Sequence, residues 1–533
     1  MIIISKYRLH PVTLIKLNPE RFQNKSSTQK ADILRQSLIP FLRKSTGITC
    51  NNIEPDELDR RVRVLHRWWT GLLAQLQNRS PTAILGSDRP LYLEGVSAIL
   101  SRPEWRPPQS EFSPLREQIS KSHSSTSLSS DSSRYSVEKS VQHNIKSLFT
   151  RTIIDTLAFA VERMGQRAAP ASIVAFAGKV VAYAFFFCNG TAEVLVNIWN
   201  IPAATMKRVL QQNGIQRSTD LRSISDEVII GFPECLHSLG CTSFAGALRQ
   251  LKKPVKPPLG NTVDWYGHWV NRWLGRDSDL LFVFLKYYHI LLCEFLPPDI
   301  SIMSHMCAPG FVFVQGHMLN IIDSTIHNRP QKSAAGPTGP SLVTFDDVLA
   351  KASTIPVPMH RTMAENKLVV LLRDVLTDRQ LCSVRCRGVL SRSFSDMLIA
   401  AAQRTGIFDA DACFTLCDMV EEILPILNFA EKLAGNRDSY IDWPFWLDVL
   451  KRMSNCDNNM TELRLICMIF TIWGLLIEED SRKRDLCLGW LLSPPTWEKF
   501  FCHWCPMVRA YFMRLVCWRL ARFNENEAND TDK

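Results

Sequence analysis

The long apolar stretch between Arg151 and Leu296 constrains the fold of this chain more than any other feature of its sequence. It holds apolar runs at residues 173–188 and 280–296, and a third run follows at residues 309–323. Prolines and glycines interrupt it at intervals of about one to two dozen residues, which is the length of a buried helix. Runs that alternate apolar and polar residues are scarce, so an extended sheet is not expected. We therefore expect an all-α protein.

Membrane-spanning helices are the alternative explanation for these runs. Residues 168–188 reach the length of about 20 residues that a bilayer requires, but Lys179 lies near their middle. A central lysine costs roughly 2.5 to 3.5 kcal/mol on insertion scales. The run at residues 280–296 is interrupted by three ionisable side chains, namely Lys286, His289 and Glu294. Burial against other helices is favoured, and an integral membrane protein stays the alternative.

Length and composition indicate a folded protein with more than one core. The chain has 533 residues, and single cores stop growing at roughly 250 to 300 residues, so two or three packed units are expected. Apolar residues make up 46% and charged residues 21%, which is close to average globular usage. The net charge of +10 is spread along the chain, so nucleic acid is not an expected partner.

The N-terminus and the cysteines indicate the compartment. Lys6 and Arg8 interrupt the apolar start of the chain, so the apolar segment of a signal peptide does not form. Disulfide frameworks belong to secreted proteins, whereas several of the 16 cysteines lie inside apolar runs and are expected to pack as small hydrophobes. We expect a cytoplasmic protein that is not secreted, with membrane association left open.

Changes in composition divide the first part of the chain. Helical spacing at residues 58–76 and 91–99 predicts an N-terminal helical region over residues 1–105. Serine makes up ten of the seventeen residues from 120 to 136. Residues 106–140 are therefore expected to be a disordered loop, because they cannot bury enough apolar area to offset the entropy of ordering. The apolar helical module follows at residues 141–327.

The second part of the chain is also predicted to be helical. A flexible linker at residues 328–341 leads to a helical region at residues 342–523, and an acidic tail ends the chain at residues 524–533. Helical patterns occur at residues 368–376, 394–403, 413–433, 443–453, 463–477 and 500–522. Pro425 is expected to kink or split the third of them. An armadillo- or HEAT-like α-solenoid and an irregular helical bundle both fit, since no clean repeat is found.

Motifs of known catalytic, cofactor or metal sites are not found in the sequence. Cys502 and Cys505 have the CxxC spacing, but a zinc site needs two more ligands, so structural cysteines are favoured. Asp277 or Ser278 is placed to cap the helix expected at the following apolar run, and this role is favoured over acid–base catalysis or metal binding by the paired Asp277 and Asp279. Asp323, Ser324 and His327 bring an acid, a hydroxyl and an imidazole together, but the strand–turn–helix nucleophile elbow of a hydrolase does not surround Ser324. We expect no enzyme, no cofactor and no metal.

Three segments are candidates for contacts with partners. Tryptophan and arginine are frequent at the centres of protein interfaces, and they gather at Trp265, Trp269, Arg272, Trp273 and Arg276. Core packing is the favoured explanation for this cluster, and partner contact is the alternative. A basic run could bind an anionic partner through Lys252, Lys253 and Lys256. The serine-rich loop is a tolerated insertion or a phosphorylated segment, with candidate sites Ser124, Ser125, Ser127, Ser129, Ser130, Ser132 and Ser133.

Several stretches resemble a fungal protein family of unknown function. The resemblance is densest between Ile145 and His327, at residues 181–199, 268–297, 308–319 and 322–327. The segments RRVRVLHRWWTGLLAQLQ and DRPLYLEGVSAILSRPEWR resemble the same proteins. The resemblance implies that some relatives are membrane proteins and that a signalling scaffold role is associated with the family. It brings no catalytic residues, and it implies that longer relatives carry an N-terminal extension missing here.

These observations favour a non-catalytic helical scaffold or adaptor that binds other proteins, in signalling or trafficking near a membrane. The alternatives are an integral membrane protein of unknown activity and, less favoured, an unrecognised enzyme. No small-molecule substrate is indicated. The enzyme alternative would require five ionisable side chains to converge on one cleft: Asp277, Asp279, His289, Asp323 and His327.

Overall fold

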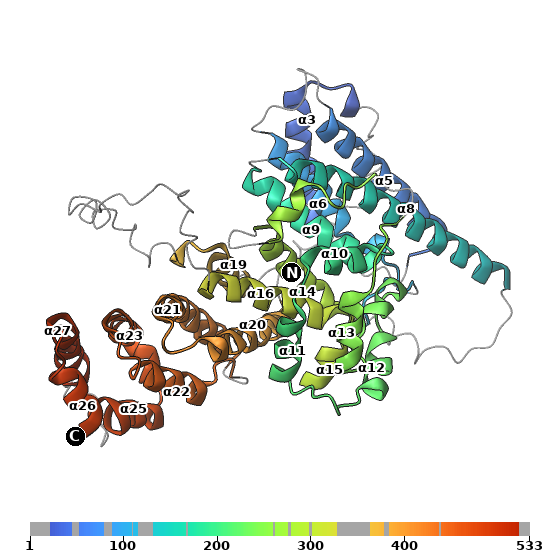
Figure 1. Cartoon of the computed structure of the whole chain (residues 1–533). Coiled ribbons are helices and arrows are strands. Elements are labelled where there is room, and N and C mark those ends of the chain that lie inside the picture. The colour runs from blue at the N-terminus through green and yellow to red at the C-terminus, as the bar shows by residue number, and fades with distance from the viewer. Residues whose placement is uncertain are drawn as a thin grey trace, which may run out of the picture. The chain divides into compact units, whose positions relative to one another are not determined.

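The computed structural model describes residues 22–44, 53–78, 88–108, 110–115, 132–166, 169–258, 262–274, 279–297, 301–327, 363–377, 383–435 and 439–521. Within these ranges the regular structure is helical, and the β-structure is one isolated bridge between Asp220 and Ser243. The prediction of an all-α, multi-helical protein is confirmed (Figure 1). Contacts divide the chain into unit 1, which ends at Val314, and unit 2, which begins at Gln315.

Helix α9 (Ala171–Phe187) lies at the centre of unit 1 and packs most extensively against α6 (Arg89–Leu100), α8 (Ser132–Met164) and α14 (Asp279–Phe295). Thirteen of its residues are buried, so it has no wide polar face, as expected for a helix at the centre of a core. It begins directly after Pro170. The prediction of buried helices in the apolar stretch is confirmed. Among the described residues, no helix has the length and apolar character required to cross a membrane.

The other helices of unit 1 surround this centre. They are α3 (Ser27–Ile33), α4 (Ile39–Lys44), α5 (Pro55–Gln77), α10 (Thr191–Trp199), α11 (Ala203–Gln212), α12 (Arg222–Ile229), α13 (Phe244–Lys252), α15 (Ile302–Cys307), the π-helical turn η1 (Leu34–Leu38) and the 3-10 helices η4 (Pro103–Trp105), η5 (Glu234–Leu239) and η6 (His268–Arg272). Helix α5 confirms the amphipathic pattern read at residues 58–76, because its apolar stripe is buried. Within that stripe, the indole of Trp69 donates a hydrogen bond of 2.9 Å to the hydroxyl of Thr156 in α8.

The predicted disordered loop at residues 106–140 was wrong at both ends. Helix α8 begins at Ser132, and Phe112 is buried with its ring 4.9 Å from that of Phe187. The apolar residues of α8 from Ile145 onward pack in the core, and an anchored helix extends readily through polar turns, because propagation costs less than nucleation. Residues 116–131, with the centre of the predicted loop, lie outside the described residues.

The division between the units falls inside α16 (Phe311–His327). The predicted linker at residues 328–341 lies outside the described residues. The ring of Phe311 packs near His289 in unit 1, whereas Asp323 accepts a hydrogen bond of 2.9 Å from Arg404 in unit 2. One continuous helix therefore contributes to two cores, and composition alone did not show this.

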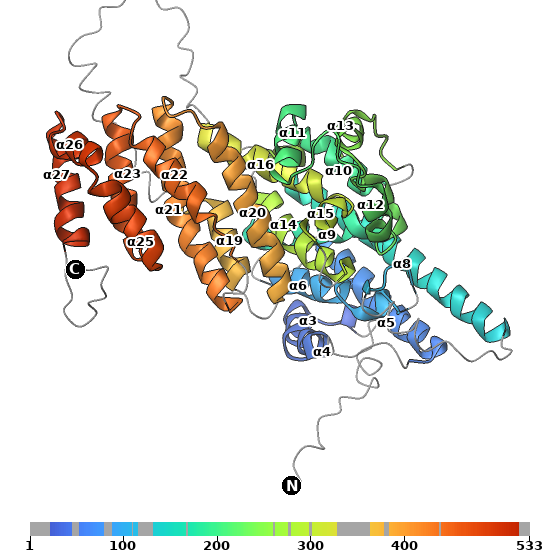
Figure 2. The same ribbon diagram turned by 90° about the horizontal axis from the view of Figure 1, so that it is seen from below.

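The helices of unit 2 are α19 (Lys367–Thr377), α20 (Val384–Arg404), α21 (Ala410–Leu433), α22 (Trp443–Met453), α23 (Asn459–Thr471), α24 (Trp473–Leu476), α25 (Asp480–Leu486), α26 (Pro494–Phe501) and α27 (Pro506–Leu515), with π-helical turns η7 (Cys487–Leu491) and η8 (Val516–Leu520). Helix α21 packs between α19 and α23, and α23 packs in turn against α27, so these helices form a stack (Figure 2). The armadillo- or HEAT-like assignment stays a prediction.

Two expectations concerned the breaks between these helices. Pro425 was expected to kink or split α21; it does not split the helix, which continues through it, and the kink stays a prediction. The single helix expected at residues 500–522 is broken between Phe501 and Pro506. Proline disfavours the helical conformation in the residue before it, and Pro506 instead occupies the first position of α27, where its missing N–H is not required.

Candidate functional site

The tryptophans of the aromatic and arginine cluster lie in the core of unit 1. Trp265, Trp269 and Trp273 are only 3%, 1% and 0% exposed. Neighbouring rings in this series lie 6.5 Å and 5.8 Å apart, and Trp273 lies 5.5 Å from the ring of Phe284 in α14. These distances are typical of aromatic packing. The packing explanation therefore fits the structure, and the indoles are not available to a partner.

Arg272 ties the end of α8 to the start of α14. Its guanidinium donates hydrogen bonds of 2.8 Å to the carbonyl oxygens of Met164 and Gln166, and it pairs with Asp279 at 3.3 Å. A cation at the C-terminal end of a helix is also favoured by the helix dipole. Arg272 thus contributes to helix packing. Arg276 and Asp277 lie outside the described residues.

The remaining candidate contact residues lie at the surface or outside the described ranges. Lys252, Lys253 and Lys256 are exposed at and after the end of α13. Ser132 and Ser133 begin α8. The other candidate phosphorylation sites lie outside the described residues, namely Ser124, Ser125, Ser127, Ser129 and Ser130. Phosphorylation and anionic partners stay predictions.

Those ionisable residues of the enzyme alternative that the structure describes are bonded to neighbouring helices or to backbone. Asp323 pairs with Arg404, and His327 bonds through Nδ1 to the carbonyl oxygen of Asp323 and through Nε2 to the hydroxyl of Thr405. The ring of His289 bonds to a carbonyl of its own helix, and burial lowers its pKa to about 4. Asp323 and His327 belong to unit 2, whereas His289 belongs to unit 1.

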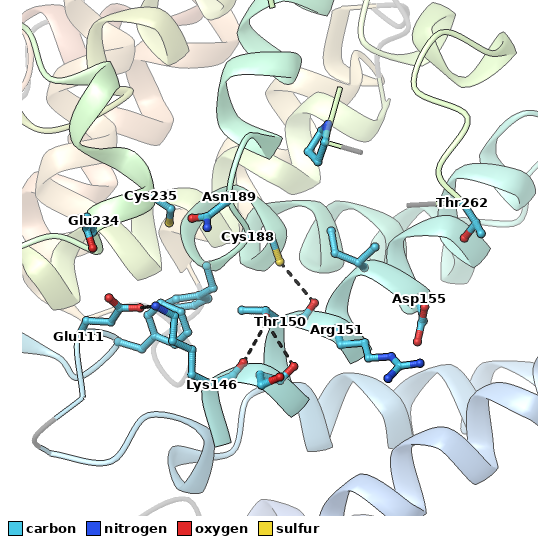
Figure 3. A pocket seen from close by; sticks show the side chains of 15 residues that line it. Glu111, Lys146, Thr150, Arg151, Asp155, Cys188, Asn189, Glu234, Cys235 and Thr262 are labelled. Carbon is cyan, nitrogen blue, oxygen red and sulfur yellow. Dashed lines mark hydrogen bonds and ion pairs between the residues drawn. The ribbon is translucent and has the colours of Figure 1, made fainter. Parts of the chain in front are cut away.

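A groove of about 730 Å³ opens in unit 1 beside α8 and the end of α9 (Figure 3). Lys146 and Glu111 form an ion pair at its wall, and Arg151 and Asp155 lie on the exposed side of α8. The hydroxyl of Thr150 donates to the carbonyl oxygen of Lys146 at 2.9 Å. The groove therefore presents a rim of mixed charge.

Two cysteines line this groove as protonated thiols. Burial raises the pKa of Cys235 to about 12 and that of Cys188 well above its usual range. Their Sγ atoms donate to the carbonyl oxygens of Phe186 and Thr150 at 3.1 Å and 3.7 Å. Because the thiolate is the nucleophilic form, these thiols are unreactive near neutral pH.

The CxxC segment forms the turn between α26 and α27. His503 lies between the two cysteines, and its Nδ1 atom accepts a hydrogen bond of 3.1 Å from the backbone of Cys505. Its Nε2 atom lies 3.1 Å from the buried carboxylate of Glu462, which also pairs with Lys499 at 2.9 Å. Within the described part of the chain, no group of three His, Cys, Asp or Glu residues is placed to hold a metal ion. The contacts of His503 hold the turn on α23.

A second groove, of about 460 Å³, lies between α21 and α24 in unit 2, and we call it the α21–α24 groove. Its lining combines apolar and polar side chains, namely Pro425, Asn428, Phe429, Lys432, Gly474, Leu475 and Glu478. Phe429 is 45% exposed. At one wall Glu478 pairs with Lys432 at 2.8 Å and accepts from Asn428 at 3.2 Å, and the hydrogen bond from Lys432 lowers the pKa of Glu478.

An exposed row of side chains along α27 and the turns on either side of it was missed in the sequence. Trp504, Met507 and Trp518 are 76%, 56% and 62% exposed. The expectation of a single helix at residues 500–522 concealed this row, because Trp504 lies in the turn that separates α26 from α27. The signal was present as helical spacing at residues 504, 507, 511, 514 and 518.

The fold and these sites define an all-helical protein in which several buried ionisable side chains hold helices together. Residues 394–520 match the family described as a protein of unknown function (DUF1765). Over 95% of its length the chain is 25% identical to a UPF0592 membrane protein of Schizosaccharomyces pombe (strain 972 / ATCC 24843), and it spans about half, 52%, of that relative. No solved structure matches. The resemblance to an uncharacterised fungal family is confirmed.

The family match covers a different segment from the one in which the resemblance is densest. It begins in α20 and ends in η8, whereas the dense resemblance was read at residues 145–327. The alignment with the S. pombe relative covers both segments. The α21–α24 groove and the exposed row on α27 both lie within residues 394–520.

Proposed function

We propose that this chain is a non-catalytic helical scaffold that binds other proteins, with the α21–α24 groove as a docking point. The observation that carries the proposal is the half-exposed ring of Phe429 in a groove of about 460 Å³. Pockets of about 300 to 1,000 Å³ hold small apolar groups, and aromatic residues are frequent anchors of interfaces. The groove is large enough for one or two apolar side chains of a partner.

The rim of the groove supports the same function. Lys432, Glu478 and Asn428 form a bonded polar group beside the apolar floor of Pro425 and Leu475. An apolar centre with a polar rim is the usual organisation of a protein interface. Pro425 has no backbone N–H, so it leaves the carbonyl four residues earlier without its usual helical partner.

The absence of catalysis is also part of the proposal. Side chains that could perform acid or base chemistry are bonded within helix contacts, as for Asp323 with Arg404. The thiols in the groove of unit 1 are protonated, because burial raises the pKa of Cys188 and Cys235. Because these acids and bases are bonded within helix contacts and the thiols are protonated, a binding protein is favoured over an enzyme.

Affinity capture with quantitative mass spectrometry, from soluble and detergent fractions, tests the docking point. A Cβ atom at Gly474 would meet no heavy atom within 4 Å, so Gly474→Ala is a matched control, whereas Gly474→Trp places an indole in the groove. Wild type and Gly474→Ala should retain a stoichiometric protein partner that Gly474→Trp loses. A wild-type capture without such a partner, or an unchanged partner with Gly474→Trp, would contradict the proposal.

An integral membrane protein is the second candidate, because the S. pombe relative carries the name of a membrane protein. Alkaline carbonate extraction of cell membranes separates the two. An integral protein stays in the pellet, whereas a scaffold attached to the surface is released. Complete release would eliminate the second candidate.

A further inference from the structure

Five side chains form one row along α27 and η8, and we call this row the terminal stripe: Trp504, Met507, Tyr511, Arg514 and Trp518. Successive members are three or four residues apart, so from Met507 onward they project from the same side of the helix, and Trp504 precedes them in the turn. Met513 and Cys517 add exposed surface beside it. The two indoles are fourteen residues apart in the sequence.

The opposite face of α27 holds the stripe in its outward position. Val508, Phe512 and Leu515 are fully buried at 0% exposure. The ring of Phe512 packs 5.3 Å from that of Phe500 and 5.8 Å from that of Trp497, both in α26. Turning the stripe inward would expose these three residues, so the exposed indoles belong to the folded state.

Two arginines fix the ends of the stripe. Arg509 donates a hydrogen bond of 3.2 Å to the carbonyl oxygen of Trp504, which holds the turn that carries the first indole. Arg519 donates to the carbonyl oxygen of Phe470 at 3.1 Å and lies 4.3 Å from the centre of that ring. Arg519 follows Trp518 directly, so it anchors the second indole to α23.

The charge of this segment has one sign. Residues 506–520 contain Arg509, Arg514 and Arg519 and no acidic residue. The guanidinium of Arg514 is exposed between Tyr511 and Trp518 and lies 5.5 Å from the centre of the Tyr511 ring. The next acidic residue along the chain is Glu525, which lies outside the described residues.

We propose that the terminal stripe docks on the surface of an anionic lipid bilayer, with α27 lying in the plane of the interface. Tryptophan favours the boundary between headgroups and acyl chains, where its ring is apolar and its N–H meets polar groups. Arginine between the indoles pairs with lipid phosphates. A row of side chains on the exposed face of a helix can contact a flat surface along its length, whereas the central anchors of protein interfaces fill pockets. This contact is separate from the α21–α24 groove.

Flotation of the full chain with vesicles tests the proposal. One set contains phosphatidylcholine alone, and the other contains phosphatidylcholine with phosphatidylserine. The chain should float with the anionic vesicles and be released as NaCl is added, because salt screens the arginines. The double variant Trp504→Ala/Trp518→Ala should bind the anionic vesicles more weakly than wild type by a factor of about ten or more. Arg514→Gln should bind them roughly fivefold more weakly.

The controls separate a lipid contact from a loss of folding. Ile230→Ala/Met460→Ala removes two apolar side chains that are 77% and 59% exposed elsewhere, and it should float like wild type. Thermal melts followed by circular dichroism check that each variant folds. Trp504→Phe/Trp518→Phe should recover part of the binding, because it restores aromatic surface without the indole N–H.

Three results would overturn the proposal. The first is no flotation of wild type with anionic vesicles. The second is equal flotation of wild type and the tryptophan double variant. The third is capture of a stoichiometric protein by wild type but not by the double variant, when neither of the two floats with vesicles. That result would make the stripe a protein interface. The groove proposal is tested separately by capture of a protein partner. Its failure does not affect the flotation test, because Gly474→Trp should float like wild type.

Discussion

His289 is buried inside unit 1, and its Nδ1 atom bonds to the carbonyl oxygen of Leu285 at 2.8 Å. Burial lowers its pKa from 6.5 to about 4. At a pH between these two values the ring is neutral in the folded chain but protonated in the unfolded chain. Between pH 6.5 and pH 4 the unfolded state binds more protons. The folded state is therefore destabilised as the pH falls through this window.

Replacing this histidine tests that coupling. His289→Phe keeps a ring in the core and removes the titration, so its free energy of unfolding should fall less on acidification than that of wild type. The difference corresponds to on the order of 3 kcal/mol across the window, at 1.36 kcal/mol for each pKa unit. Urea denaturation at several pH values measures it. The exposed His143→Gln is the control, and a parallel pH dependence in wild type and His289→Phe would contradict the assignment.

At the scale of elements, the contact between α9 and α14 depends on the absence of a side chain at Gly178. A Cβ atom there would lie 2.6 Å from Cβ of Val283 and 3.1 Å from the backbone nitrogen of Phe284. Alanine stabilises most helix interiors relative to glycine by about 1 kcal/mol. Here the steric clash is larger than that gain, so the sign of the effect reverses.

Gly178→Ala should lower the free energy of unfolding by roughly 1 to 3 kcal/mol, which is the usual cost of overpacking a core. The exchange Gly178→Ala/Val283→Gly should recover part of this loss, because it removes the opposing Cβ atom. Gly474→Ala serves as the control, since its Cβ atom meets open space. Chemical denaturation measures all three. A Gly178→Ala variant as stable as wild type would show that the helices move apart without cost.

Helices α21 and α23 are joined by a buried ion network. Arg464 pairs with Asp418 and, at 2.6 Å, with Glu421, and the exposed fractions of Arg464 and Asp418 are 8% and 1%. Removing one partner of a buried pair leaves a charge without compensation. Arg464→Met should therefore destabilise unit 2 by roughly 3 to 5 kcal/mol.

The double variant Arg464→Met/Asp418→Leu should recover part of that stability, because it replaces the Arg464–Asp418 pair by apolar side chains and leaves only Glu421 without its partner. Thermal and urea unfolding of the three proteins measure the difference. Equal losses in the single and double variants would mean that Arg464 acts through packing alone, for example on the ring of Phe414 at 5.9 Å.

At the scale of the whole molecule, the two proposed contacts use different surfaces of unit 2. The α21–α24 groove involves α21 and α24, whereas the terminal stripe lies on α27 and η8. We expect Gly474→Trp to lose the protein partner and keep binding to anionic vesicles, and the tryptophan double variant to do the reverse. Capture and flotation of both variants measure this. Loss of both activities in either variant would show one shared surface.

The sequence predicted helices well where local spacing decides them. The stripe of α5, the buried helix α9 and the bounds of α22 follow from apolar periodicity. The disordered loop was drawn too long, because composition does not show that Phe112 packs on Phe187. The boundary inside α16 was likewise hidden in an unbroken helical pattern.

The candidate sites depended more strongly on the tertiary structure. The run from Trp265 to Trp273 has the composition of an interface, yet its tryptophans are buried, whereas Trp504 and Trp518 are exposed although tryptophan and arginine gather around them as well. Exposure is set by helices far away in the chain, which local patterns do not encode. The α21–α24 groove likewise joins residues 425–432 to residues 474–478.

The sequence by itself determined that this chain folds into helices around an apolar core. The spacing of apolar residues and the positions of prolines determine where helices form, and both act over only a few residues of the chain. The tertiary structure alone decided which ionisable groups are neutral, which indoles are exposed and where the two units divide. These properties depend on burial and on contacts between residues that are distant in sequence, such as Arg464 with Asp418. Such contacts exist only once the helices have packed.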